Sequence, residues 1–274
     1  MIFKPGEEIC AEFPCKIVQR LAGGSMAELY LANVKNTPHM VGIKGLGAQE
    51  TQIKKEALSK EASVLNKLRH EKIPQFFGFF EEENRIYYVM SYQEGACLEQ
   101  LVRRKCSLVL PEERVCNIAL QLCGILAYIH KKEVVHGDIK PANLLLSEYG
   151  DLTLLDFGTA VFGGEHMKTD SDKSKYRFQG TLGFAAPECW HGGRVHLTPE
   201  TDIFALGATL FYLLEGREPR ECFGNFVLSE ENQEKKNRWQ PVLNKCCAME
   251  ASKRYHSAAE VYKDIKQIYT TLAM

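Results

Sequence analysis

The sequence lacks any apolar run that approaches the roughly 18 residues needed to cross a membrane. Its opening residues, MIFKPGEEIC, also lack the pattern of a secretory signal peptide. Because nothing in this pattern directs the chain into or through a membrane, we expect a cytoplasmic protein without a membrane segment.

The chain has no excess of charge of either sign. Lys and Arg number 34 against 35 Asp and Glu, which leaves a formal net charge of −1 over 274 residues. A balance of this kind gives no case for nucleic acid or an anionic membrane as partner. The length and the 45% of hydrophobic residues suit one large domain or two modest lobes, each with its own core.

The ten cysteines lack the paired C-x-x-C spacing that marks a zinc site. Cys10 and Cys15 are separated by four residues, and Cys246 and Cys247 are adjacent. A reducing compartment disfavours disulfides, so we expect free, buried thiols rather than a disulfide framework or a metal centre.

Internal repeats and low-complexity tracts are also absent. The type of secondary structure that the sequence predicts changes once along the chain. Residues 15–45 alternate like short strands with glycine-rich turns, residues 50–69 carry apolar side chains at helical spacing, and residues 73–92 are typical of an aromatic-rich hairpin. After a break at residues 93–95, helices are predicted at residues 97–104, 111–132, 198–215 and 256–272.

Polar side chains gather on one short loop, VVHGDIKPANLLL (residues 134–146), between two apolar runs. The loop presents Asp138, Lys140 and Asn143, and the apolar stretch LTLLDFG ends in Asp156 ten residues later. Two acids and an amide at strand ends suit a divalent cation that prefers oxygen ligands, such as Mg²⁺. A lysine beside them supplies a compact positive charge for a phosphate.

These stretches resemble the catalytic loop H-R-D-L-K-x-x-N and the D-F-G motif of the eukaryotic-like serine/threonine protein kinase family, in the HGD variant seen in bacterial members. The resemblance covers residues 15–268. It implies an α+β fold of two lobes: a small β-sheet lobe with one main helix at residues 1–92 and a larger, mostly helical lobe at residues 93–274.

The resemblance implies an ATP-dependent enzyme that uses Mg²⁺ or Mn²⁺ and phosphorylates a protein substrate on serine or threonine. Asp138 would accept or orient the proton of the substrate hydroxyl, and Lys140 would neutralise charge on the transferring group. Asn143 and Asp156 would hold the metal ions. A lysine two residues after the loop aspartate is the usual serine/threonine form.

In VGIK, Lys44 would reach the α- and β-phosphates of ATP and would pair with a glutamate on the following helix. Glu61 fits that position. Glu56 is the rival, roughly 150° away around the helix axis.

The phosphate-covering loop matches only in part, because LAGGSMAEL stands where three glycines are expected. Ala22, Gly24 and Ala27 occupy the three glycine positions. The resemblance also implies a set of groups around the adenine: Leu21, Leu29, Met90, Ser91, Gln93 and Leu145.

Other motifs imply structural contacts rather than chemistry. In GTLGFAAPE, Thr181 would bond to the catalytic loop and Glu188 would pair with Arg254. Asp202 would hold the backbone of the catalytic loop from a buried helix, and His136 would be a packing residue.

Gly137 replaces the arginine that commonly clamps a phosphorylated activation segment. Residues 156–188 still carry Thr169, Ser171 and Ser174. We therefore expect activity that does not strictly depend on their phosphorylation.

Two alternatives remain open at this point. Small-molecule phosphotransferases related to aminoglycoside and choline kinases also carry HGD, although they usually lack A-P-E and the lysine at the position of Lys140. The missing glycines also allow a catalytically weak kinase fold that serves as a binding module, although Lys44, Glu61, Asp138, Asn143 and Asp156 are all present.

Overall fold

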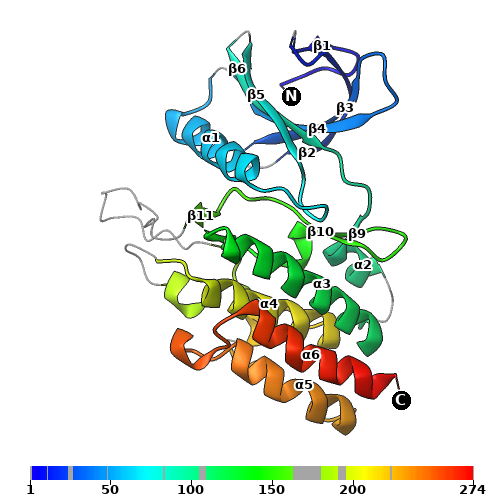
Figure 1. Cartoon of the computed structure of the whole chain (residues 1–274), viewed down its shortest axis with the longest axis vertical. Helices are drawn as coiled ribbons and strands as arrows, with labels where there is room; N and C mark the ends of the chain where they lie inside the picture. Colours follow the sequence, from blue (N-terminus) through cyan, green and yellow to red (C-terminus); the bar gives the residue numbers. More distant parts are fainter. Residues whose placement is uncertain are drawn as a thin grey trace. The chain divides into compact units, whose positions relative to one another are not determined.

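The structure, a computed structural model, describes residues 2–10, 12–23, 27–47, 49–82, 84–104, 109–162, 180–190, 196–222 and 224–273 (Figure 1). The chain divides into two compact units, Met1–Glu94 and Gly95–Met274. The sequence places the boundary between the lobes two residues earlier, within the same connecting stretch.

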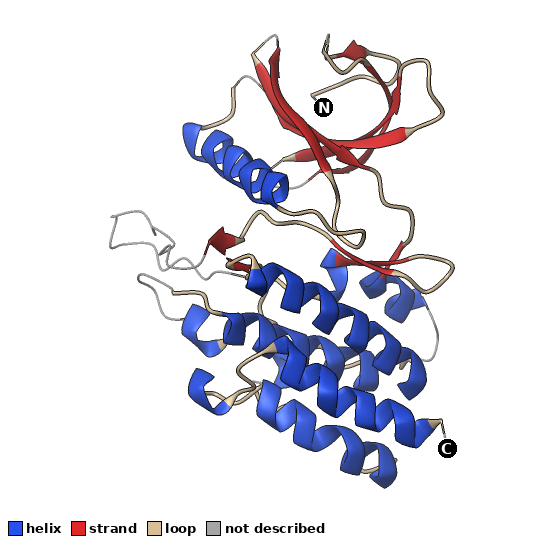
Figure 2. Ribbon diagram, viewed as in Figure 1, coloured by secondary structure: helices blue, strands red, loops and turns tan. Residues whose placement is uncertain are grey.

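The first unit contains an antiparallel sheet of six strands and one helix in its described residues. Its elements are β1 (Glu8–Ile9), β2 (Cys15–Gly23), β3 (Glu28–Val34), β4 (Met40–Leu46), α1 (Gln52–Lys67), β5 (Phe76–Glu82) and β6 (Arg85–Ser91). The strand order is β1-β2-β3-β4-β6-β5, and the sheet is strongly curled (Figure 2).

The two faces of this sheet carry different chemistry. Side chains alternate between the faces of a strand, so neighbouring residues point in opposite directions. One face buries an apolar core that includes Tyr30, Ile43 and Tyr87. The opposite face carries Lys44 together with its cross-strand partners on β3 and β6. The core therefore supports, from behind, the surface that carries Lys44.

Helix α1 forms where helical spacing predicted it, and it packs through Leu58, Ala62 and Leu65, which are buried. Glu61 is buried on the same helix at 4% exposure, which is costly for a carboxylate without partners. Its burial therefore points to a specific contact.

The second unit is mostly helical in its described residues (Figures 1 and 2). Its helices are α2 (Leu98–Arg104), α3 (Glu112–Lys131), α4 (Pro199–Glu215), α5 (Gln233–Cys246) and α6 (Ala258–Leu272). Short strands form two small sheets: β7 (Ala96–Cys97), β9 (Leu144–Leu146) and β10 (Leu152–Leu154) in one, and β8 (Val134–Val135) and β11 (Val161–Phe162) in the other. Single helical turns lie at η1 (Pro141–Asn143), η2 (Pro187–Cys189), η3 (Pro219–Cys222) and η4 (Ala251–Lys253).

Helix α4 is the centre of this unit, and every residue from Thr201 to Leu214 is buried. It begins with a capping box in which the side chains of Thr198 and Thr201 bond to each other's backbone N–H, and Pro199 occupies the first helical position. This helix is apolar on all sides, as a helix inside a core must be. It carries Asp202 into that core.

Helix α5 was not predicted from the sequence. Pro241 interrupts its pattern, since a proline inside a helix removes a backbone hydrogen bond. The helix persists because the side chain of Asn232 accepts the N–H of Lys235 at its start and because Trp239 and Leu243 are fully buried.

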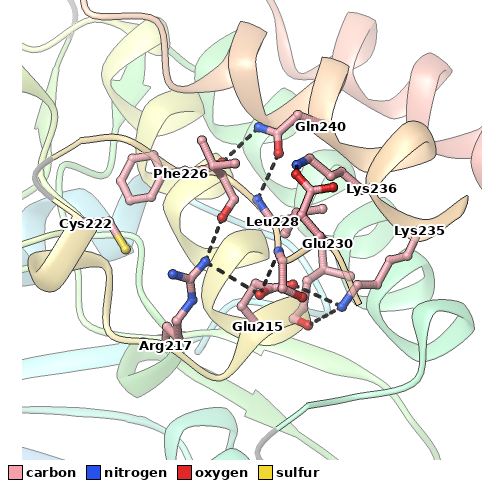
Figure 3. Close-up of polar contacts among 12 residues, drawn as sticks. Glu215, Arg217, Cys222, Phe226, Leu228, Glu230, Lys235, Lys236 and Gln240 are labelled. Carbon is pink, nitrogen blue, oxygen red and sulfur yellow. Dashed lines mark hydrogen bonds and ion pairs between the residues drawn. The ribbon is translucent and has the colours of Figure 1, made fainter. Parts of the chain in front are cut away.

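Side chains hold the irregular segment that precedes α5 (Figure 3). Gln240 donates from Nε2 to the carbonyl of Phe226 and accepts the N–H of Leu228 at Oε1, both at 2.9 Å. Glu215, at the end of α4, accepts the N–H of Ser229 at 3.2 Å and pairs with Lys235 at 3.1 Å. These side chains satisfy backbone groups that have no strand neighbour, so the segment is fixed without regular secondary structure.

The nine described cysteines are free thiols, and all of them except Cys97 and Cys222 are buried. Burial raises the pKa of Cys15, Cys116, Cys123 and Cys189 to about 12. Such thiols are poor nucleophiles and poor metal ligands. No helix among the described ranges is long and apolar enough to cross a membrane.

Candidate active site

Asp138 is the centre of a network in the loop between β8 and η1. Lys140 Nζ lies 2.6 Å from Asp138 Oδ2 and 2.6 Å from Thr181 Oγ1. Thr181 in turn donates to Asp138 Oδ1 at 2.9 Å, which confirms the expected bond between Thr181 and the loop. Asn143 donates from Nδ2 to the backbone oxygen of Asp138 at 2.8 Å and to Oδ2 at 3.1 Å. Together these contacts fix the direction in which the carboxylate of Asp138 points.

Asp202 anchors the backbone of this loop from helix α4, as predicted. Its Oδ2 accepts the N–H of His136 at 2.9 Å and lies 2.8 Å from His130 Nε2, while Oδ1 accepts the N–H of Gly137 at 2.8 Å. Burial by itself raises the pKa of Asp202, but the hydrogen bond and charge of His130, with the N–H of Gly137, hold that pKa below its usual value. The loop is thus tied to the most buried helix of its unit.

His136 is a packing residue, as expected. Its side chain is fully buried, and its Nε2 lies 3.0 Å from the carbonyl oxygen of Leu155. The ring meets that of Phe157 edge to face, with centroids 4.8 Å apart. These contacts bring the stretch that carries Asp156 against the catalytic loop.

Asn143 and Asp156 lie at the same edge of the small β7-β9-β10 sheet. Leu144 pairs with Leu154, and the N–H of Leu155 donates to the carbonyl of Asn143 at 2.9 Å, so the pairing continues to the residue before Asp156. Asp156 has a φ of +60°, a conformation that is uncommon for a residue with a side chain. The sheet thereby brings the two predicted metal ligands together.

The donor atoms of this pair fit a hard divalent cation. Because the amide nitrogen of Asn143 is bonded to Asp138, its carbonyl oxygen is the atom left to act as a ligand beside the carboxylate of Asp156. No group of three or more His, Cys, Asp or Glu in the described part of the chain could hold a metal alone. A Mg²⁺ ion held by one or two protein oxygens normally takes its other ligands from water and substrate phosphates.

Lys44 and Glu61 form an ion pair in the first unit. Lys44 Nζ on β4 lies 2.7 Å from Glu61 Oε1 on α1, and the side chains are 18% and 5% exposed. Tyr88 on β6 donates its hydroxyl to the same oxygen at 2.9 Å. The rival Glu56 is exposed and accepts a hydrogen bond from Gln52 at 3.1 Å instead. The pair fixes the ammonium group on the face of the sheet opposite the core.

An apolar surface lies next to Lys44 on the same face, over Gly42. A Cβ added to Gly42 would lie 3.3 Å from Met90 Cε and 3.9 Å from Leu29 Cδ1. Leu29 pairs in register with Lys44 and with Ala22, which forms a row across three strands. Neither Gly42 nor Tyr88 was predicted from the sequence. Gly42 stands two residues before Lys44, which puts both on one face of β4.

The remaining predicted nucleotide residues have varied surroundings. Leu21 is 38% exposed, and Ala27 is partly buried. Gly24 lies outside the described residues. The N–H of Ser91 donates to the carbonyl of Gln75 at 2.8 Å, and Gln93 Nε2 donates to Ser91 Oγ at 2.8 Å.

Leu145 belongs to the second unit. It lies on β9 between its register partners Cys97 on β7 and Thr153 on β10. It is partly buried there, and the register of β9 with both neighbours fixes its position.

Arg254 and Glu188 form the predicted long-range pair. Arg254 is 1% exposed, and its NH1 and NH2 donate to the two oxygens of Glu188, both at 2.8 Å. Thr201 donates to Glu188 Oε1 at 2.9 Å. Partial burial raises the pKa of Glu188, but the bonds and charge of Arg254 outweigh this and hold the pKa below its usual value. The segment that carries Thr181 is thereby fixed at its far end.

The chain contains three arrangements that a phosphotransferase needs. They are a positioned carboxylate with a lysine beside it, a pair of oxygen ligands for a divalent cation, and a lysine–glutamate pair next to an apolar surface. The protein kinase domain family matches residues 15–271. The chain therefore belongs to the protein kinase family, which confirms the resemblance and the α+β fold class.

Several relatives are named serine/threonine kinases. The chain is 30% identical over 280 residues to serine/threonine-protein kinase D of Synechocystis, an alignment that covers 93% of this chain and 52% of that protein. It is 30% identical over 269 residues to serine/threonine-protein kinase PrkC of Bacillus subtilis, covering 93% and 40%. Aurora kinase of Schizosaccharomyces pombe is 32% identical over 209 residues, covering 75% and 56%. The chain thus spans about half the length of the curated relatives it matches.

Proposed function

We propose that this chain is an ATP-dependent protein kinase that transfers the γ-phosphate to serine and threonine hydroxyls of protein substrates. The observation that carries the proposal is the network around Asp138, in which Lys140 and Thr181 bind both carboxylate oxygens. The names of the relatives point to the same activity.

In the proposed reaction, Asp138 orients the acceptor hydroxyl and accepts its proton as the oxygen attacks the γ-phosphorus of ATP. The bond from that phosphorus to the β-phosphate oxygen breaks, and ADP leaves. Lys140, which donates a hydrogen bond to Asp138, stabilises the negative charge that develops on the transferring group. Lys44 binds the α- and β-phosphates and Glu61 holds it in place. Most of the rate gain then comes from positioning and electrostatics, as is usual for phosphoryl transfer.

We also propose Mg²⁺ as the metal, held by Asn143 and Asp156. When bound, the ion neutralises phosphate charge. A pair of oxygen ligands supports Mg²⁺. Mn²⁺ is the alternative, because it also prefers oxygen ligands. Rates measured with each ion alone would decide between them.

For the adenine, we propose Leu21, Leu29, Met90 and Leu145 as apolar contacts and the backbone groups of Ser91 and Gln93 as hydrogen-bonding partners. Ala22, Gly24 and Ala27 belong to the loop that would cover the phosphates. Because Leu29 and Met90 approach each other over Gly42, we add Gly42 to the apolar surface.

The test is transfer of label from γ-labelled ATP to a generic basic protein, followed by identification of the labelled residue. Asp138→Asn is expected to lower kcat by about 100-fold, the usual contribution of a positioned base. Asp156→Asn should remove activity at low metal concentration. Asp151→Asn, an exposed carboxylate between β9 and β10, is the matched control and should behave like the wild type.

Label on serine or threonine that disappears in both site variants would support the proposal. An Asp138→Asn variant that is as active as the wild type would contradict the proposal. Transfer to a small molecule but to no protein would favour the small-molecule phosphotransferases, an alternative that the family match does not favour.

A further inference from the structure

The segment 2–10 lies before the region matched by the kinase family, yet it belongs to the core of the first unit. Phe3 is fully buried. Its ring meets Tyr30 on β3 and Tyr87 on β6 edge to face, with centroids 5.3 Å and 5.4 Å away. Because β4 lies between β3 and β6 in the sheet, one side chain connects the two strands that flank β4. Figure 1 shows this segment within the curl of the sheet.

Phe3 also lies directly behind the strand that carries Lys44. A Cβ on Gly45 would lie 3.5 Å from Phe3 Cε2 and 2.8 Å from the Cβ of Tyr87. The missing side chain at Gly45 therefore lets the ring approach the backbone of β4. Since Gly45 and Lys44 face opposite sides of the sheet, the ring supports β4 from the side opposite to the ammonium group.

Polar contacts tie the same segment to the β2–β3 hairpin. The N–H of Ile2 donates to the Tyr30 hydroxyl at 2.7 Å and to Glu28 Oε2 at 3.0 Å. Glu28 also pairs with Arg20 on β2 at 3.1 Å. Glu28 and Gly23 are the last described pair of β2 and β3. These contacts therefore lie next to the residues predicted to cover the phosphates.

Further contacts tie the segment to β5 and β6. Arg85 pairs with Glu7 at 2.5 Å, and its guanidinium lies 4.8 Å from the centre of the Phe3 ring. The N–H of Cys10 donates to Glu82 Oε2 at 2.9 Å. The segment thus bridges the hairpin on one side of β4 and the β5–β6 pair on the other.

We propose that residues 2–10 are a positioning element for the nucleotide, with Phe3 as its central residue. By holding the β2–β3 hairpin in register with β4, the segment presents Lys44 and the hairpin to the phosphates in a preformed arrangement. A preformed site loses less conformational entropy on binding, so its affinity is higher. This inference rests on the proposed use of ATP.

The proposal predicts a change in affinity for ATP rather than in the chemical step. The phosphates bound by Lys44 are held in the ground state and in the transition state alike, so a looser site weakens both equally. Such a loss raises KM and leaves kcat unchanged. A change confined to the stability of the fold would alter neither value at a temperature where the protein is folded.

The experiment compares Phe3→Ala with Phe13→Ala, measured below the unfolding transition of both. Phe13 packs on the same core and stacks on Phe77 with ring centroids 5.8 Å apart. None of its atoms is among those nearest to a Cβ added at Gly45. We expect Phe3→Ala to raise KM and Kd for ATP about tenfold, which corresponds to a loss of about 1.4 kcal/mol of binding free energy, with kcat within about twofold of the wild type. Phe13→Ala should leave KM within about twofold, and Phe3→Leu, which keeps most of the volume, should restore most of the affinity.

Calorimetric titration with ATP separates this inference from the proposed function, because it needs no phosphate transfer. An unchanged Kd in Phe3→Ala, or an equal rise in Phe13→Ala, would overturn the positioning role even if the wild type is an active kinase. A wild type that binds ATP but transfers no phosphate would overturn the proposed function, and the Kd comparison would still decide the role of Phe3. A wild type without affinity for ATP would overturn both. If Phe3→Ala is unfolded at the assay temperature, Glu7→Gln, which weakens the ion pair between the segment and Arg85, provides the comparison, and a Kd equal to that of the wild type again counts against the inference.

Discussion

The carboxylate of Asp202 accepts the backbone N–H of Gly137 at 2.8 Å, at a point where the chain has a φ of +78°. The loop can therefore turn toward its buried anchor because residue 137 has no side chain. A Cβ there would lie 2.8 Å from Leu197 Cδ1 and 3.4 Å from the carbonyl oxygen of Thr159. The glycine that stands in place of the usual arginine thus also allows the positive φ of the catalytic loop and avoids a clash with Leu197.

Gly137→Ala should destabilise the protein and lower its activity. A positive φ costs an alanine about 1 to 2 kcal/mol, and the contact with Leu197 adds to that cost. Gly150→Ala is the matched control, because Gly150 has a φ of +88° but no atom within 4 Å of the added Cβ. Thermal unfolding should show a larger loss for Gly137→Ala than for Gly150→Ala, and only the former should lower kcat. Equal losses and equal kcat would show that the contact at Gly137 does not matter.

Replacing Thr169, Ser171 and Ser174 together by alanine should leave most of the activity. These residues lie outside the described part of the structure, and the prediction rests on Gly137, which supplies no positive charge for a phosphate. Initial rates of the triple variant, compared with those of the untreated wild type and of wild type treated with a phosphatase, measure the effect. A loss of about tenfold or more would contradict the expectation, since clamps of this kind control whether the site is assembled.

Glu61→Gln should weaken phosphate transfer without unfolding the protein. The glutamine keeps an oxygen for Tyr88 and Lys44 but removes the negative charge that holds the lysine, so we expect kcat/KM for ATP to fall about tenfold or more. Glu56→Gln, on the exposed side of α1, is the control and should leave kcat/KM unchanged. If both variants behave alike, the pairing of Lys44 with Glu61 has no role in the reaction.

Glu188 should contribute to acid sensitivity. Its pKa is lowered from an ordinary value of 4.5, so the unfolded chain binds the proton more readily than the folded one. The stability it provides is therefore fully present above about pH 4.5 and is lost as the pH falls toward the lower folded pKa. Melting temperatures across this range should fall less steeply in Glu188→Gln than in the wild type.

The same variant should be less stable at neutral pH, because the buried Arg254 loses its charged partner. Breaking a buried pair in this way costs about 3 kcal/mol or more. Glu113→Gln, an exposed position on α3, should change neither the stability nor its pH dependence. An acid transition that is identical in the wild type and in Glu188→Gln would show that this carboxylate does not titrate with unfolding.

Local patterns predicted most elements, with bounds close to those observed. Apolar spacing predicted helices at residues 50–69 and 198–215, where the structure has Gln52–Lys67 and Pro199–Glu215. The pattern failed at Gln233–Cys246, because Pro241 and many charged residues hide an apolar face that is visible only once Trp239 and Leu243 are buried. It also missed the short strand Glu8–Ile9, which is held by its pairing with β2 rather than by its own composition.

The candidate site was also predictable in large part, because its polar residues occur as compact motifs. Asp138, Lys140 and Asn143 lie within six residues, and the antiparallel pairing of β10 with β9 brings Asp156 back to them. Gly42 and Tyr88 were missed, since their relevance depends on which side chains approach them from neighbouring strands.

The sequence by itself determined the family, the order of helices and strands, and the residue types that can perform the proposed chemistry. The resemblance implied that Asp202 holds the catalytic loop and that Glu188 pairs with Arg254. Only the tertiary structure decided that Asp202 does so at the N–H of Gly137, that a buried Arg254 binds both oxygens of Glu188, and that Phe3 fills the space behind Gly45. The physical reason is range. Periodicity and turn chemistry act between residues a few positions apart, whereas these contacts join residues about 40 to 70 positions apart and form only when the whole core is packed.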